Sequence, residues 1–215
     1  MTDLLALGGQ VLQAAMTLTA ATVLFALSDR RLLMVPVALQ YILVASLMGP
    51  SVGLPMFGIR LTMGLAISAI LYITATRMEK LLGQPVRRGP GNTSPHITLP
   101  QMGPVFRVLA YALAALLAVG LWNSYPVPGV PAALQLSAFW LLALGGSIVL
   151  TSADPLRIGV GILVAINGFQ TAYLTLESSL LIVALTGLVD LLITLAIAYA
   201  SDRWIESIVD EVTGS

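Results

Sequence analysis

The stretch LLIVALTGLVDLLITLAIAY, residues 180–199, decides the class of the fold. About twenty apolar residues in a row cross the ~30 Å hydrocarbon core of a bilayer as one α-helix. A single carboxylate, Asp190, interrupts this run near its centre. A charge at that depth costs roughly 2.5–3.5 kcal/mol. The acid is therefore either functional or, in its protonated form, a hydrogen-bonding group that holds two helices together.

The composition of the whole chain agrees with a membrane protein. Of its 215 residues, 58% are hydrophobic and only 9% are charged, with a mean hydropathy of +0.95, whereas a soluble domain carries about 25% charged residues. We therefore predict an all-α integral membrane protein in contact with the lipid bilayer. Zero net charge argues against nucleic acid as a partner. The chain has no Cys and one His, so we expect no metal, no bound cofactor and no catalytic site of its own.

Hydropathy divides the chain into about seven transmembrane helices, with Pro and Gly at several joints. The predicted spans are 4–27, 32–49, 54–76, 105–122, 133–151, 157–176 and 179–200. They group into a first three-helix unit (1–81), a polar cytoplasmic loop (82–104), a linking helix (105–122), a second three-helix unit (133–200) and a cytoplasmic tail (201–215). Because the linking helix returns the chain to its starting side, the two units should be parallel in the membrane.

The basic residues sort to one side of this arrangement. With seven spans, nine of the ten Lys and Arg residues fall in connections or at span ends on one side, the exception being Arg60. Because cytoplasmic loops are enriched in Lys and Arg, we expect the N-terminus outside and the C-terminus in the cytoplasm. The expected location is the inner (plasma) membrane of a bacterial or archaeal cell.

An internal repeat relates the two predicted three-helix units. A shift of 127 residues places Gln40 on Asn167, Met63 on Asp190 and Tyr72 on Tyr199. Both units have a basic entry, an apolar span, a short outer turn and a second span that ends in a Tyr followed by charge. The sequence therefore predicts a duplicated unit, although the two copies share few identical residues.

Polar side chains lie near the middle of several spans. From the 1.5 Å rise per residue, Asp190 lies roughly 16 Å from Ser179, Asn167 roughly 15 Å from Arg157 and Gln40 roughly 12 Å from Leu32, where their spans begin. Gln170 is about one turn from Asn167, and Thr186 is one turn from Asp190. Together these five side chains could form a proton relay. The alternative is that the amides only hold helices together, which for Gln40 alone is the favoured interpretation.

Arg60 is the other charge within a span, roughly 9 Å from the outer face. Two interpretations remain open from the sequence. Its long side chain could extend to the membrane surface. Alternatively, Arg60 is a counter-charge for an acid on this chain or on a neighbouring subunit.

Two segments around Asn167 and Asp190 resemble a known family. The segments IGVGILVAING (158–168) and GLVDLLITLAIAYASDR (187–203) are similar to the K subunit (chain 4L) of respiratory complex I and to the C subunits of multi-subunit cation/proton antiporters. Chain length, seven spans and a duplicated unit look more like hydrogenase-4 component E, a subunit of complex-I-like membrane-bound hydrogenases. The resemblance implies that Asp190 is the family's acid in the last span and Asn167 its mid-span Asn.

The chain also departs from this family at three positions. Complex I relatives carry a second acid four residues before the mid-span Asn, where this chain has Leu163. Component E relatives carry an acid just before that Asn and a Lys in the third span, where this chain has Ile166 and Met63. Arg60, one turn before Met63, could replace the Lys.

The resemblance implies an accessory membrane subunit of a complex-I-like, ion-translocating assembly. Its partners would be large antiporter-like subunits and a redox or quinone-facing module. Its own part would be a proton relay through Asp190, with a path that is either shortened or altered to run through Gln40, Asn167 and Gln170. Two alternatives remain: a standalone secondary transporter, whose helices should break at the bilayer midplane, and a structural spacer in which Asp190 only joins helices.

Overall fold

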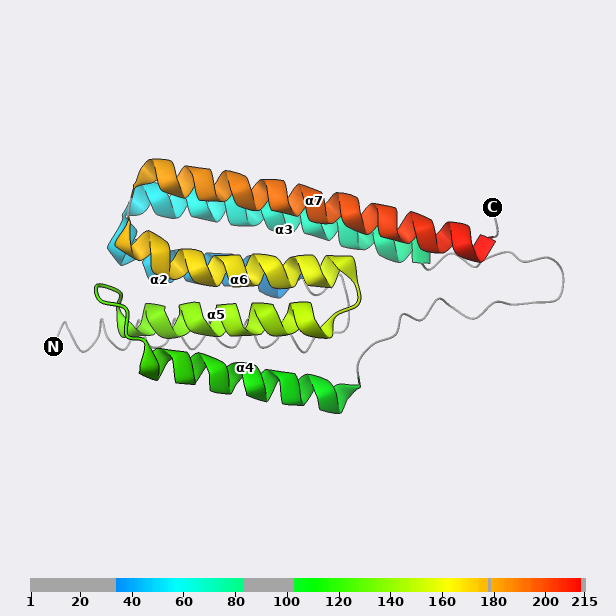
Figure 1. Cartoon of the computed structure of the whole chain (residues 1–215). Coiled ribbons are helices and arrows are strands. Elements are labelled where there is room, and N and C mark those ends of the chain that lie inside the picture. Colours follow the sequence, from blue (N-terminus) through cyan, green and yellow to red (C-terminus); the bar gives the residue numbers. More distant parts are fainter. Residues whose placement is uncertain (1–33, 83–102, 178, 214–215) are drawn as a thin grey trace.

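A computed structural model describes residues 34–82, 103–177 and 179–213 of the chain (Figure 1). Within these residues it contains six α-helices and no strand. The helices are α2 (Met34–Val52), α3 (Leu54–Leu82), α4 (Pro104–Ser124), α5 (Ala132–Thr151), α6 (Pro155–Leu176) and α7 (Leu180–Thr213). The predicted all-α class is therefore confirmed for the described part of the chain.

Local sequence signals account for several helix ends. Gly53 joins α2 to α3 with a φ of +86°, a backbone conformation that residues with a Cβ rarely adopt. Helix α6 begins with Pro155, whose fixed φ suits the first helical position. The Asp154 carboxylate caps this end by accepting a hydrogen bond from the Leu156 backbone nitrogen at 3.1 Å, as N-cap residues do.

The helices form an elongated bundle in which distant parts of the chain pack together. Helices α4, α5 and α6 pack in sequence order, α2 packs on α3 and α6, and α7 packs on α3 and α6. In Figure 1, α3 and α7 lie side by side and run in the same direction, and α2 and α6 both run in the opposite direction. Hairpin α2–α3 therefore has the same orientation as hairpin α6–α7.

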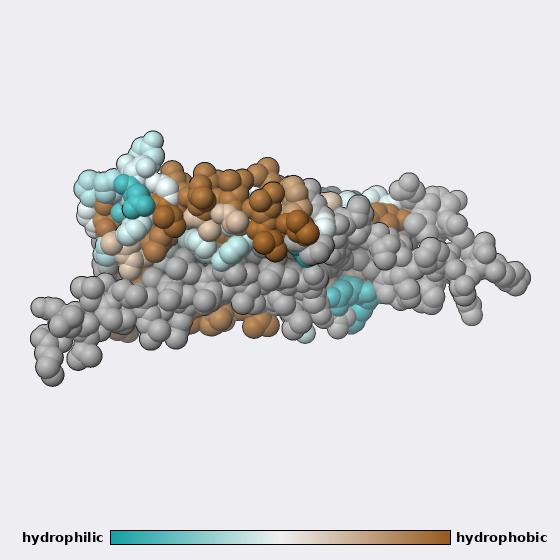
Figure 2. Space-filling model, turned by 90° about the horizontal axis from the view of Figure 1, so that it is seen from below, coloured by the Kyte–Doolittle hydropathy of each residue, from teal (hydrophilic) through white to brown (hydrophobic). Residues whose placement is uncertain are grey.

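Length and composition suit five of these helices to crossing a membrane. Apolar stretches of sufficient length occur at Leu54–Leu81, Val105–Ser124, Ala132–Thr151, Pro155–Leu176 and Leu180–Ile208, while α2 supplies the shorter apolar stretch Met34–Leu47. Many large apolar side chains face outward, including Val108, Leu109 and Leu116 of α4. Figure 2 shows such a hydrophobic patch over the middle of one face. Apolar side chains that face outward are compatible with contact with lipid. Together with the five apolar helices, they indicate a multi-pass membrane protein.

The structure supports the later predicted spans more fully than the earlier ones. The last five spans overlap α3 to α7, although α3 and α7 extend past the predicted ends, and the second span overlaps most of α2. The predicted span 4–27 and most of the loop 82–104 lie outside the described residues. The count of seven helices and the two parallel three-helix units therefore stay predictions.

Helices α3 and α7 are longer than a membrane span requires. Their 29 and 34 residues correspond to roughly 44 and 51 Å, against a hydrocarbon core of ~30 Å. Both extend past the other helices at one end of the bundle (Figure 1). The predicted tail 201–215 is thus not separate from the last span, because its residues up to Thr213 continue α7. Ser201 and Ile205 are fully buried in this continuation.

Candidate functional site

The site is built around the interior face of α6. Asn167 and Gln170 lie about one turn apart on this helix, and both are buried. A buried amide without a partner is costly, so each should bond to a neighbouring helix. Thr171 continues the polar face, and its hydroxyl donates to the Asn167 carbonyl oxygen at 2.6 Å. Helix α6 therefore presents a polar strip to the centre of the bundle.

Asp190 of α7 faces this strip. Its side chain is only 3% exposed, and its Oδ1 accepts a hydrogen bond from Gln170 Nε2 at 2.9 Å. One turn later, the Thr194 hydroxyl donates to the Asp190 backbone carbonyl at 2.7 Å. The acid predicted from its isolation in an apolar run is thus buried between helices, with an amide donor on one oxygen.

Arg60 reaches the same strip from α3. It is 8% exposed, and its Nη2 donates a hydrogen bond to Asn167 Oδ1. A side chain that extended to the membrane surface would be exposed at its tip. Burial among polar groups therefore favours the other interpretation, in which Arg60 is a counter-charge inside this chain.

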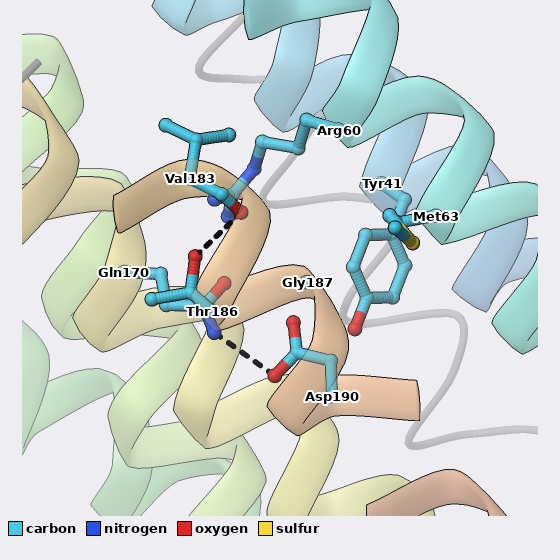
Figure 3. A pocket seen from close by; sticks show the side chains of 8 residues that line it. All are labelled: Tyr41, Arg60, Met63, Gln170, Val183, Thr186, Gly187 and Asp190. Atoms are coloured by element: carbon cyan, nitrogen blue, oxygen red, sulfur yellow. Dashed lines mark hydrogen bonds between the residues drawn. The ribbon is translucent and has the colours of Figure 1, made fainter. Parts of the chain in front are cut away.

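The two charges share one small cavity (Figure 3). Four helices line it, through Tyr41 (α2), Arg60 and Met63 (α3), Gln170 (α6), and Val183, Thr186, Gly187 and Asp190 (α7). The space open to a water-sized sphere is about 10 Å³, close to the lower limit for one water molecule. Opposite charges attract far more strongly in such an enclosed place than in water.

The structure brings together most, but not all, of the predicted relay. Asp190, Gln170, Thr186 and Arg60 line the cavity, and Asn167 is bonded to Arg60. Thr186 uses its hydroxyl hydrogen within its own helix, donating toward the Ile182 and Val183 carbonyls. Gln40 is buried on α2 but does not line the cavity.

Sequence reasoning missed Tyr41, whose ring forms one wall of the cavity. The sequence predicts its neighbour Gln40 as a relay residue instead, because an amide within an apolar span is unusual. The ring lies against Gly64 of α3, where an added Cβ would come 2.6 Å from the Tyr41 Cβ. A buried tyrosine hydroxyl usually needs a polar partner, but the sequence alone does not show that this hydroxyl is buried.

The predicted repeat has a counterpart in the cavity. The shift of 127 residues pairs Met63 with Asp190, and it also pairs Arg60 with Gly187. All four residues line the cavity, two from α3 and two from α7. Each charged residue therefore corresponds to a neutral residue in the other hairpin, so that one hairpin supplies the cation and the other the anion.

The arrangement can hold a buried acid next to a fixed cation and exchange a proton with hydrogen-bonding neighbours. Among the described residues, no group of three or more His, Asp and Glu side chains could hold a metal ion. No protein-family model, curated protein or solved structure matches this chain. The interpretation of the site therefore depends on its own geometry.

Proposed function

We propose that this protein is an accessory membrane subunit of a complex-I-like, ion-translocating assembly of the membrane-bound hydrogenase or antiporter type, and that it contributes a proton relay through Asp190. One observation carries the proposal. A carboxyl group is buried in the membrane part of the bundle, bonded to a mid-helix amide, and shares a cavity with a buried guanidinium. Intramembrane ionisable groups mark ion and proton pathways in many membrane proteins.

The depth of the site supports a role in translocation. Asp190 lies ten residues past the start of α7, which is roughly 15 Å along the helix. Asn167 lies twelve residues past the start of α6, roughly 18 Å along it. Both depths are close to the middle of a ~30 Å core. A proton held there has left one aqueous phase without having reached the other.

The hydrogen bonds connect helices across the bundle, which supports lateral transfer of a proton. Asp190 bonds to Gln170, and Asn167 on the same face of α6 bonds to Arg60. These contacts lead from α7 through α6 to α3, across the bundle rather than along a helix axis. A path of this kind would pass a proton between neighbouring subunits of the assembly.

In this proposal the partners perform the redox chemistry. The chain would lie between large antiporter-like subunits and a redox or quinone-facing module, in a bacterial or archaeal plasma membrane. The N-terminus would be outside and the C-terminus cytoplasmic. Arg107 and Arg157 lie in the first turns of α4 and α6, and these helix starts share one end of the bundle with the ends of α3 and α7 (Figure 1). Arg77 and Lys80 lie near the end of α3, which supports a cytoplasmic location for this end.

One structural observation favours a second candidate, the spacer subunit. The Gln170–Asp190 hydrogen bond joins α6 to α7, and such bonds stabilise membrane bundles by about 0.6 kcal/mol on average. The third candidate, a secondary transporter, gains no such support. Broken midplane helices are its hallmark, and α3, α5, α6 and α7 run without interruption.

The first experiment isolates the assembly and then tests the acid. A C-terminally tagged chain is purified from native membranes in mild detergent, and its partners are identified by mass spectrometry. Asp190→Asn is then compared with wild type in inverted vesicles, energised by the substrate of the co-purifying module. We expect unchanged assembly and ion translocation per turnover lowered by roughly a hundredfold, the low end for a positioned proton-transfer group.

Asp202→Asn is the matched control, because it removes a more exposed carboxylate from the same helix. It should leave translocation unchanged. Full pumping by Asp190→Asn would rule out the relay. A fall in complex yield with normal flux through the remaining complex would identify the spacer instead. Purification as a homo-oligomer without partners would favour the standalone transporter.

A further inference from the structure

The Tyr41 hydroxyl is a buried polar group that the relay described above does not use. Tyr41 is 4% exposed, and its hydroxyl has no hydrogen-bond partner among the described residues. Buried hydroxyls without partners are uncommon in native proteins. The hydroxyl points into the cavity, toward Asp190 (Figure 3). This position makes Tyr41 a candidate partner for the acid.

The position of the Tyr41 ring is fixed by the chain around it. An ideal Cβ on Gly64 would lie 2.6 Å from the Tyr41 Cβ and 2.7 Å from its Cγ. No real Cβ makes such close contacts, so only glycine lets the ring lie where it does. Gly58, earlier on the same helix, has no atom within 4 Å of an added Cβ. The absence of a side chain at residue 64 therefore matters for the Tyr41 ring.

The donors around Asp190 explain why a hydroxyl is needed. Gln170 offers its amide N–H to Oδ1, and a guanidinium such as that of Arg60 can only donate. These groups suit the ionised carboxylate. A protonated acid instead needs an acceptor for its own O–H, and a tyrosine hydroxyl both donates and accepts. Tyr41 is therefore suited to bond Asp190 in either protonation state.

The cavity has room for one water between the two groups. Asp190 and Tyr41 form no direct hydrogen bond, and the cavity between the helices is about the size of one water molecule. A water in a polar cavity needs two or more partners. The Tyr41 hydroxyl, the Asp190 carboxyl and the Arg60 Nε, which also has no described partner, could supply them.

We propose that Tyr41 is a positioning residue for Asp190 and that a single water held in the cavity bridges the two side chains. This water accepts the O–H hydrogen bond of the protonated acid. The proposal deepens the proton relay and rests on it for its functional meaning. It adds α2 to the path, next to the buried amide of Gln40. The contact between Tyr41 and Asp190 can nevertheless be tested without measuring translocation.

Infrared difference spectroscopy tests the contact directly. Purified protein in lipid is perfused alternately with acidic and alkaline buffer, and the carboxyl band of Asp190 is identified by its loss in Asp190→Asn. The internal water is identified by the shift of its O–H stretching band in water labelled with heavy oxygen. We expect Tyr41→Phe to move the carboxyl band to higher frequency and to abolish the water band.

Two pairs of variants make the result specific. Gly64→Ala, which displaces the ring, should reproduce the effect of Tyr41→Phe, whereas Gly58→Ala should not. Tyr111→Phe removes a hydroxyl from α4, which does not line the cavity, and should leave both bands unchanged. In vesicles of the intact assembly, Tyr41→Phe should lower translocation without lowering the amount of complex.

Three results would overturn the proposal. One is an unchanged carboxyl band in Tyr41→Phe, and another is a band that moves in Thr186→Val instead. The third is the absence of any carboxyl band dependent on Asp190, because the proposed bond requires the protonated acid. Failure of the relay would look different: Asp190→Asn would pump normally while Tyr41→Phe still shifted the carboxyl band.

Discussion

Helix α6 contacts α5 on one side and α2 and α7 on the other, and the two contacts are built from different atoms. Toward α5 it presents glycines. A Cβ added at Gly145 of α5 would lie 2.5 Å from the Ala165 nitrogen and 2.5 Å from the Gly161 oxygen. Toward α7 it presents one glycine, Gly159, against Ile197, and it also presents Gln170, which bonds to Asp190. The first contact is close backbone packing without a polar side-chain bond, whereas the second adds a polar cluster around a cavity.

The difference supports the proposed relay, because only the polar contact contains groups that can exchange a proton. In a membrane, helices associate through close packing of small residues and through interhelical hydrogen bonds, because lipid is as apolar as a leucine side chain. The glycine contact provides packing without any charge. The polar contact places two charges at a depth where each is costly. A purely structural contact does not require two charges at this depth. Variants at the α5–α6 contact and at the polar cluster should therefore behave differently.

The largest effect is expected at Arg60. Arg60→Met keeps much of the side-chain length but leaves Asp190 in a cavity without its cation. Removing one partner of a buried charge pair leaves the other uncompensated, and we expect a loss of about 3 kcal/mol in unfolding free energy. Thermal unfolding in detergent would measure it. Arg77→Met, on the exposed end of the same helix, should stay close to wild type.

The double variant Arg60→Met/Asp190→Asn sharpens this test. Removing both charges takes away the uncompensated acid, so it should recover a large part of the lost stability. If the double variant were as unstable as Arg60→Met alone, the loss would come from packing around Arg60. The two charges would then not be coupled through the cavity.

A smaller loss is expected on the glycine side. Gly145→Ala forces a methyl group against the backbone of α6, and overpacking of this kind costs about 1–3 kcal/mol. The neighbouring Gly146 is the matched control, because a Cβ there meets no atom within 4 Å. Alanine favours a helix more than glycine does, so Gly146→Ala should be neutral or slightly stabilising in the same unfolding assay. Equal losses at both positions would contradict close packing of α5 on α6.

The sequence predicted the apolar part of the fold well, because long apolar runs admit few alternatives in a bilayer. The spans predicted at 105–122 and 133–151 differ from α4 and α5 by at most two residues at each end. The last span was less accurate. The prediction ended it near residue 200, whereas α7 continues to Thr213. A hydropathy window follows the membrane and does not detect a helix that extends beyond it.

The site was predictable only where a residue was unusual in its surroundings. Asp190 stood out as a charge in an apolar run, and Gln170 as an amide near the middle of a span. Tyr41 and Gly187 gave no such signal, because tyrosine and glycine are ordinary in membrane helices. Their importance comes from which helices pack together, and α2 and α7 are separated by more than a hundred residues of chain. No local pattern contains that information.

The smallest effect is expected where the same two helices meet outside the apolar core. Arg77 of α3 and Asp202 of α7 form an ion pair with an N–O distance of 3.1 Å, and their side chains are 67% and 32% exposed. Exposed pairs contribute about 0–1 kcal/mol and weaken further as salt increases. A double-mutant cycle with Arg77→Met and Asp202→Asn should therefore give a coupling energy below about 1 kcal/mol that falls with added salt. The corresponding cycle at Arg60 and Asp190 should give a larger coupling that is insensitive to salt, because those charges are buried. Equal coupling and equal salt dependence at both pairs would mean that water reaches the cavity freely, and the distinction between the polar cluster and the surface would be lost.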